Sequence, residues 1–229
     1  MESTTAATSD ASSDGGVTSG ASPAAECPVH PHLAVCYPFP PGVTDALADG
    51  SGSEAHGSMK NVTLVDGLTD HGKAVRVDAA SEITAGDHPA FRPQYFTLSV
   101  LVYPEGDGYI FDYENHIGLQ LVGSKVSCQV ISDGGQYPIT SVAIELSQWS
   151  HVGCSFDGSE IRVWVEDMSG PEENAISLGG ILNPSPGPGV TVGMNSPELD
   201  QRLSGLIDDV LLFDAALTRE ELCAFHPFC

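Results

Sequence analysis

Residues 149–167, WSHVGCSFDGSEIRVWVED, constrain the fold more than any other part of the chain. Apolar and polar residues alternate in two short runs, which is the period of strands that bury one face. The alternating apolar residues are Val152, Cys154 and Phe156 in the first run and Ile161, Val163 and Val165 in the second. Between the runs, Gly158 can take the positive φ that a tight reversal needs. The stretch therefore predicts a β-hairpin in an antiparallel, half-buried sheet.

The rest of the chain repeats this pattern of short strands separated by turn residues. We expect strands at 33–39, 74–78, 82–84, 96–103, 109–113, 117–122, 125–131, 139–145, 190–193 and 203–213, with loops at 40–57 and 169–174. Thr218, with Glu221 three residues later, forms a capping box and predicts a short C-terminal helix. Many short strands and one helix predict an all-β fold of two antiparallel sheets, packed about 10 Å apart.

The hairpin also resembles the central hairpin of laminin-G-like domains in the concanavalin A-like lectin/glucanase superfamily. Four other stretches match that family in order: 33–39, 49–57, 96–104 (FTLSVLVYP) and 203–222 (LSGLIDDVLLFDAALTREEL). The resemblance implies a jelly-roll sandwich in which the first and last strands are neighbours. It implies little about function, because such folds include lectins, adhesins, binding modules and hydrolases.

Composition excludes several classes of function. The chain has 8 basic and 31 acidic residues, a net charge of −23, so it repels nucleic acids and anionic membranes. No run of 18 apolar residues predicts a membrane span. Residues 1–26, rich in Ser, Thr, Ala, Gly and Asp, predict a disordered spacer before a domain at 27–229. The spacer resembles the segment that follows the lipidated cysteine of a bacterial surface lipoprotein, here without its leader; a cytosolic start at Met1 is the alternative.

Six cysteines suit an oxidising, extracellular compartment. Cys128 and Cys154 share the apolar side of their strands, so we expect them to pair in the core. The other four are Cys27, Cys36, Cys223 and Cys229. Because the family places the first and last strands side by side, the resemblance implies bridges between the two ends, with the partners left open. Buried free thiols are the alternative.

The resemblance also implies a structural calcium ion between the loop at 49–57 and the last strand. Calcium binds six to eight hard oxygens, which a loop rich in Gly, Ser and Asp can supply. The candidate ligands are Asp49, Ser53, Glu54, His56 through its backbone oxygen, and Asp208. The alternative is an ordinary solvated loop, with Asp208 bonded to backbone amides.

Catalysis is not expected. The acidic pairs Glu166-Asp167 and Asp208-Asp209 are adjacent in strands, so their side chains point to opposite faces, and no nucleophile motif is present. His151 is interpreted as a packing and hydrogen-bonding residue.

A ligand site is predicted from Trp164, which faces away from the apolar set of its strand. An aromatic platform with nearby polar side chains is typical of sugar recognition. The candidate residues are Trp164, Tyr109, Tyr113, Tyr137, Asn115 and Gln136; burial of Trp164 under a loop is the alternative. The sequence thus predicts a secreted or surface-anchored module, without catalysis, that binds a carbohydrate or an extracellular protein. The alternatives are an adhesive spacer and a glycan-active hydrolase.

Overall fold

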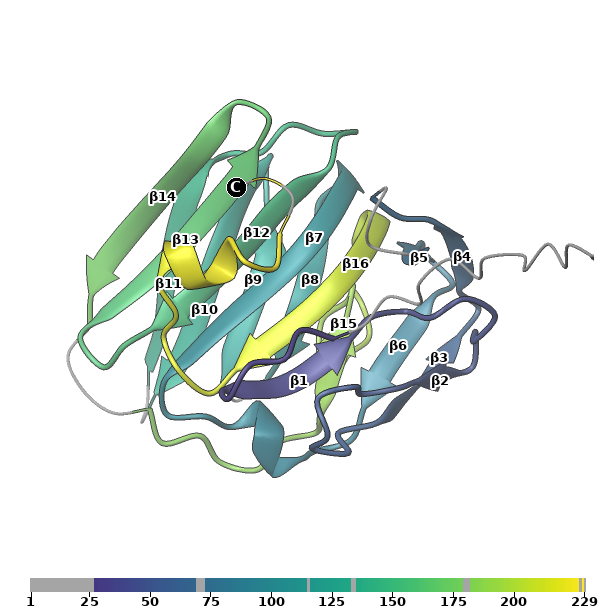
Figure 1. Ribbon diagram of the computed structural model, residues 1–229, viewed down its shortest axis with the longest axis horizontal. Helices are drawn as coiled ribbons and strands as arrows, with labels where there is room; N and C mark the ends of the chain where they lie inside the picture. Colours follow the sequence, from purple (N-terminus) through teal and green to yellow (C-terminus); the bar gives the residue numbers. More distant parts are fainter. Residues whose placement is uncertain are drawn as a thin grey trace, which may run out of the picture.

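Two antiparallel sheets pack face to face in the computed structural model, which describes residues 27–68, 73–114, 116–132, 135–178, 182–226 and 228 (Figure 1). Sheet A has the order β14-β13-β12-β7-β16-β5-β4, and β1 also pairs with β16. Sheet B has the order β11-β10-β9-β8-β15-β6-β3-β2. This arrangement confirms the predicted all-β sandwich.

The strands are short, apart from β7 and β16 at the centre of sheet A. In sheet A they are β1 (Leu33–Tyr37), β4 (Thr63–Asp66), β5 (Lys73–Val77), β7 (Phe96–Gly106), β12 (Ser150–Phe156), β13 (Glu160–Asp167), β14 (Gly170–Ser177) and β16 (Ser204–Phe213). In sheet B they are β2 (Ala46–Leu47), β3 (Gly57–Lys60), β6 (Glu82–Ala85), β8 (Gly108–Tyr113), β9 (Ile117–Leu121), β10 (Lys125–Ser132), β11 (Gly135–Ala143) and β15 (Val190–Val192). A 3-10 turn, η1 (Pro89–Phe91), and a short helix, α1 (Arg219–Leu222), complete the described elements.

The core lies between the two sheets, and its composition confirms the alternation seen in the sequence. The inward residues of the hairpin β12–β13 are at most 2% exposed, and so are those of β7 beside it: Val152, Cys154, Phe156, Ile161, Val163, Val165, Phe96, Leu98, Val100 and Val102. Side chains of opposite parity on these strands point to the outer face of sheet A, away from sheet B. A second apolar cluster lies there, formed by Cys36, Trp164, Leu211, Phe213 and Leu222.

The first and last strands are neighbours, as the resemblance implied. β1 pairs with β16 from Leu33 opposite Phe213 to Tyr37 opposite Val210. β16 also pairs with β7, and the register of that pair shifts between Asp208 and Leu211. Asp209 takes a positive φ of 44° at this bulge. Asp208 lies just before the shift, opposite the buried Leu101.

The disulfides agree with one cysteine prediction and correct another. Cys128 of β10 is bonded to Cys154 of β12, as predicted, so this bond joins the two sheets. Cys27 is bonded to Cys36, nine residues away, so it does not join the two ends of the chain. Pairing between β1 and β16 already holds those ends together. Cys223 is also disulfide-bonded, and Cys229 lies outside the described residues, as does the spacer predicted at 1–26.

Local signals explain which elements were predicted and which were not. Thr218 caps α1 through the expected capping box with Glu221. The loop predicted at 169–174 is wrong, because β14 runs through it as an edge strand. Almost every residue of β14 is exposed, so it shows no apolar alternation. The loop predicted at 40–57 contains the two-residue strand β2, which is too short for a pattern. Among the described residues, no helix has the length and apolarity to cross a membrane.

Removing the bond between the sheets tests its contribution to stability. The Cys128–Cys154 link closes a loop of 26 residues, for which chain entropy predicts about 3.5 kcal/mol of stabilisation. We expect the double variant Cys128→Ala/Cys154→Ala to lose about this much free energy of unfolding in a urea titration. The control Cys27→Ala/Cys36→Ala opens a loop of nine residues and should lose less, about 2.5 kcal/mol. Equal losses, or a larger loss in the control, would contradict this account.

Candidate functional site

A pocket of about 230 Å³ lies on the outer face of sheet A. Its floor and one wall come from β12, β13 and β14, and its other wall comes from the C-terminal segment, residues 214–226, which includes α1. Figure 1 shows α1 lying across β13. The lining residues are Ser155, Asp157, Glu160, Arg162, Trp164, Glu166, Pro171, Glu172, Glu173, Ala216, Leu217, Thr218, Arg219 and Leu222.

Trp164 forms part of the pocket floor. Its parity places it on the outer face, as predicted, and the C-terminal segment covers it so that only 7% of its surface remains exposed. A side chain at Gly153, the cross-strand partner of Trp164, would collide with the indole, so the glycine makes room for it. Leu217 and Leu222 pack in the same cluster. The pocket thus joins an aromatic and aliphatic floor to a polar rim.

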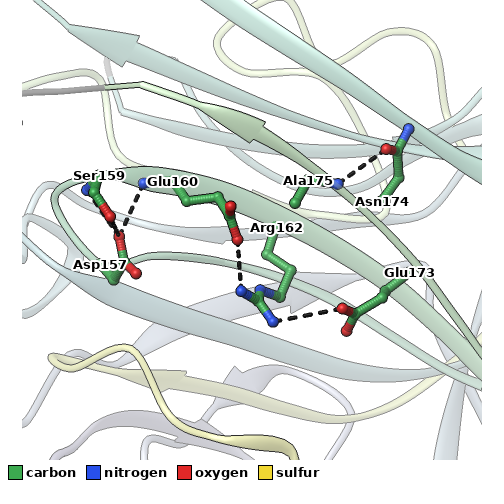
Figure 2. A network of polar contacts seen from close by, with 7 residues as sticks. All are labelled: Asp157, Ser159, Glu160, Arg162, Glu173, Asn174 and Ala175. Atoms are coloured by element: carbon green, nitrogen blue, oxygen red, sulfur yellow. Dashed lines mark hydrogen bonds and ion pairs between the residues drawn. The ribbon is translucent and has the colours of Figure 1, made fainter.

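The rim is organised by Arg162, which projects from β13. Its guanidinium donates to Glu160 at 2.5 Å and to Glu173 of β14 at 3.5 Å (Figure 2). Asp157, at the hairpin turn, accepts hydrogen bonds from the amides of Ser159 and Glu160 at 2.8 and 2.9 Å. These contacts tie the turn and the edge strand β14 to the middle of the hairpin.

A chain of hydrogen bonds starts in the pocket lining, continues among buried residues and joins sheet A to the C-terminal segment. Arg219 donates to Glu166 at 2.6 Å, and the other oxygen of Glu166 lies 3.0 Å from Nδ1 of His151. Nε2 of His151 lies 3.0 Å from the hydroxyl of Ser99, which also bonds Nε2 of His226 at 2.6 Å. The two imidazole rings stack with centroids 3.7 Å apart. We name these five residues the relay; they confirm the prediction that His151 packs and hydrogen-bonds.

Burial and hydrogen bonding shift the pKa values of two neighbouring residues of the relay, Glu166 and His151. Burial raises the pKa of Glu166, but hydrogen bonds from His151 and Arg219 outweigh burial and hold the pKa below its ordinary value. Burial lowers the pKa of His151, against the opposing effect of Glu166. Glu166 is therefore ionised and faces Arg219.

Ser99, His151 and Glu166 have the connectivity of a nucleophile, base and acid. However, Ser99 and His151 have no exposed surface, and Ser99 is bonded by a second histidine. A substrate cannot reach that hydroxyl while the C-terminal segment covers it. The arrangement therefore fastens the segment in place and does not present a nucleophile. Sequence reasoning missed it because the three residues lie on three different strands and form no motif.

The structure does not bring Tyr109 and Tyr113 of the predicted platform together with Trp164. Tyr109 and Tyr113 lie on β8 of sheet B, whereas Trp164 lies on the outer face of sheet A. Tyr113 is fully buried, and its hydroxyl donates to Asp87 at 2.6 Å. Asn115 lies outside the described residues, and so do the side chains of Gln136 and Tyr137. The polar partners of Trp164 come instead from β13, β14 and the C-terminal segment, which share its face of the sheet.

The predicted calcium loop is held together by Asp49. Its carboxylate accepts from the amides of Cys36, Ser51 and Ala55 and from the hydroxyls of Ser51 and Ser53, at 2.9–3.1 Å. The ring of His56 accepts from the amide of Asp49 at 3.0 Å. These donors use the lone pairs of Asp49 that a cation would need. Asp49 therefore organises the loop, and as folded it does not fit a calcium ion.

Asp208 differs from Asp49, because one of its carboxylate oxygens is buried and accepts no hydrogen bond from the described residues. It has no exposed surface, and Oδ2 has no hydrogen-bond partner among the described atoms. Burial, with a contribution from Asp209, raises the pKa of Asp208 to about 9. Glu54 is exposed. The five predicted ligands therefore do not fit a cation as a set, although Asp208 alone has the character of a ligand; calcium stays a prediction. Within the described chain, no cluster of three or more His, Cys, Asp or Glu residues has a metal-binding arrangement.

Chelation tests the calcium prediction directly. If a cation is held at Asp208, EDTA lowers the thermal midpoint of the wild type but leaves that of Asp208→Asn unchanged. Equal wild-type midpoints with and without EDTA would contradict the site. In that case Asp208→Asn should be more stable than the wild type at pH 8. The pKa of Asp208 is raised in the folded state, so the wild type loses free energy of unfolding as the pH rises above about 4, whereas the asparagine variant does not.

The relay predicts a pH dependence of stability. With the pKa of His151 below its ordinary value of 6.5, the folded protein binds fewer protons than the unfolded chain as the pH falls below 6.5. The stability that the neutral imidazole contributes is therefore present above pH 6.5 and is lost on acidification. We expect the urea midpoint to fall between pH 6.5 and pH 4.5, and to fall less in His151→Gln. An unchanged slope in the variant would contradict the role of His151.

Comparisons with solved structures identify the same fold in proteins of low sequence identity. Domain 4 of AbnA, a GH43 extracellular arabinanase from Geobacillus stearothermophilus, solved with arabinotriose, is 19% identical, with a TM-score of 0.66 over 84% of this chain and 97% of that one. The binding domain of Paraclostridial Mosquitocidal Protein 1 is 15% identical, with a TM-score of 0.63 over 83% and 51%. The Ruminococcus gnavus IT-sialidase CBM40, bound to α2,3-sialyllactose, is 12% identical, with a TM-score of 0.51 over 72% and 96%.

No curated protein matches the sequence significantly. A laminin-G-like family model, described as the concanavalin A-like lectin/glucanases superfamily, matches residues 78–223, which is more than half of the chain. The matched region includes β12, β13, β14 and most of the pocket. The chain therefore belongs to the concanavalin A-like lectin/glucanases superfamily.

Proposed function

We propose that this protein is a non-catalytic carbohydrate-binding module and that the pocket over β13 and β14 is its ligand site. One observation carries the proposal. The pocket places the indole of Trp164 and the side chains of Leu217 and Leu222 beside a rim of hydrogen-bonding groups. Sugars present an apolar ring face together with hydroxyls, so they need both kinds of contact in one place.

The polar groups of the pocket are held in position before any ligand binds. Arg162 is fixed between Glu160 and Glu173, and Arg219 is fixed by Glu166. Side chains that are already ordered lose less entropy when they bind a ligand. This supports a binding role for a pocket that is modest in volume.

The structural neighbours support a binding role of this kind. The AbnA domain was solved with arabinotriose and the CBM40 domain with sialyllactose, and the toxin domain is described as a binding domain. Their identities to this chain are below 20%, so the fold alone is shared, and the glycan ligand is part of the proposal.

We propose a non-catalytic role because the side chains that resemble a catalytic triad are buried. The hydroxyl of Ser99 lies beneath the C-terminal segment, and its two histidine partners are buried as well. The adjacent acids Glu166 and Asp167 lie on opposite faces of β13. The disulfides favour a secreted or surface-attached protein; attachment by lipid stays a prediction.

Filling the pocket tests the proposal. Trp149→Phe leaves Trp164 as the only tryptophan of the chain, so its fluorescence reports directly on the pocket. We expect glycans identified on an array to change this fluorescence saturably. In the same background, Ala216→Phe fills the pocket without adding a tryptophan and should weaken binding by at least about tenfold, or 1.4 kcal/mol.

The matched control is Ala48→Phe, at an exposed loop position away from the pocket lining. It should bind as the parent does. Thermal melting of both variants checks that each is folded. A chain that binds no glycan on the array would favour the adhesive spacer, and equal binding by Ala216→Phe would place the ligand elsewhere.

A further inference from the structure

The charge of the pocket limits which glycans it can take, provided that the pocket is the glycan site proposed above. Five of its lining residues carry carboxylates and two carry guanidinium groups: Asp157, Glu160, Glu166, Glu172 and Glu173 against Arg162 and Arg219. No lysine contributes to the lining. The lining is therefore negative before any ligand binds.

Each arginine of the pocket is already paired with a carboxylate of the protein. Arg162 donates to Glu160 at 2.5 Å and to Glu173 at 3.5 Å. Arg219 donates to Glu166 at 2.6 Å, and that glutamate is buried and bonded to His151 as well. Recognition of a ligand carboxylate usually relies on a guanidinium fork that faces it. A ligand carboxylate or sulfate that approaches Arg162 also meets Glu160 and Glu173, and one that approaches Arg219 also meets Glu166. These carboxylates offset the positive charge of the guanidinium groups.

The surroundings reinforce this effect. The chain has 8 basic and 31 acidic residues, so the field outside the pocket also repels anions. At physiological salt this repulsion extends about 8 Å from each exposed charge. An anionic glycan is therefore repelled both on approach and at the site.

Uncharged and amine-bearing sugars are not repelled by the carboxylates of the pocket. Carboxylates accept hydrogen bonds from hydroxyl groups, and such charge-assisted bonds are stronger than neutral ones. A protonated amine gains an ion pair in addition. The aliphatic side chains of Leu217, Leu222 and Pro171 suit the ring face of either sugar.

We propose that the pocket selects uncharged or amine-bearing glycans and excludes glycans that carry a carboxylate or a sulfate. The arginines act within the protein, as clamps for Glu160, Glu173 and Glu166, and they do not recognise an acidic ligand.

Matched ligands on one sugar skeleton test the proposal. The probes are an uncharged oligosaccharide that binds on the array and its derivatives with an amine, a carboxylate or a sulfate at one position. We expect the uncharged and amine forms to bind within a few fold of each other, and the acidic forms to bind at least about tenfold more weakly at 50 mM salt. Higher salt should narrow the gap, because it screens the repulsion.

A charge variant adds a second, independent readout. Glu160→Gln/Glu173→Gln removes both carboxylate partners of Arg162, so the guanidinium becomes available, and binding of the carboxylate probe relative to the uncharged one should rise at least about tenfold. Glu82→Gln is the matched control, because it breaks the exposed Lys60–Glu82 ion pair on sheet B and should leave the ratio unchanged.

The outcomes separate the two proposals. Acidic probes that bind as tightly as the uncharged probe, or a ratio that does not change in the double variant, would overturn charge selection and leave glycan binding standing. A protein that binds none of the probes, and no glycan on the array, would overturn glycan binding and charge selection together.

Discussion

The side chains that sheet A contributes to the candidate site take their positions from the packing of sheet A against sheet B. The inward residues of β7, β12 and β13 are almost completely buried, so these strands cannot slip by one residue without turning their apolar faces to water. That constraint fixes the residues between them on the outer face. Ser99, His151 and Trp164 are brought together in this way, although they are far apart in the sequence. The Cys128–Cys154 bond crosses the same core and holds the two sheets together.

Features that depend on alternation or on local motifs could be predicted from the sequence. The hairpin β12–β13, the outward position of Trp164, the pairing of Cys128 with Cys154 and the cap at Thr218 follow from parity or from short spacings. The strand β14 could not be predicted in this way, because an edge strand that is exposed on both faces has no apolar periodicity. Because β14 supplies one wall of the pocket, the sequence could place Trp164 on the outer face but could not identify the residues of β14 that lie beside it.

The assignment of partners across the sheets failed for a related reason. Tyr109 and Tyr113 are polar aromatic residues near strand ends, and nothing in the sequence says which sheet a strand joins. Pairing β8 with β9 and β15 places both tyrosines in sheet B. The relay was missed because hydrogen bonds between residues 99, 151 and 226 depend on how the C-terminal segment folds back over the sheet. Such a contact between distant segments cannot be predicted from residue types and spacings.

The relay also explains why the C-terminal segment has one defined position. The apolar contacts of Leu222 and Phe213 would allow the segment to shift, because hydrophobic packing is weakly directional. The buried hydrogen bond between Ser99 and His226 and the bond that Arg219 donates to the buried Glu166 favour one register, since another would leave Ser99 and Glu166 without these partners. The pocket lies between this fixed segment and β13, so its shape depends on one polar contact in its lining, between Glu166 and Arg219, and on another behind the lining, between Ser99 and His226. The residues that have the connectivity of catalytic machinery therefore act here as positioning residues for the pocket that we propose as the binding site.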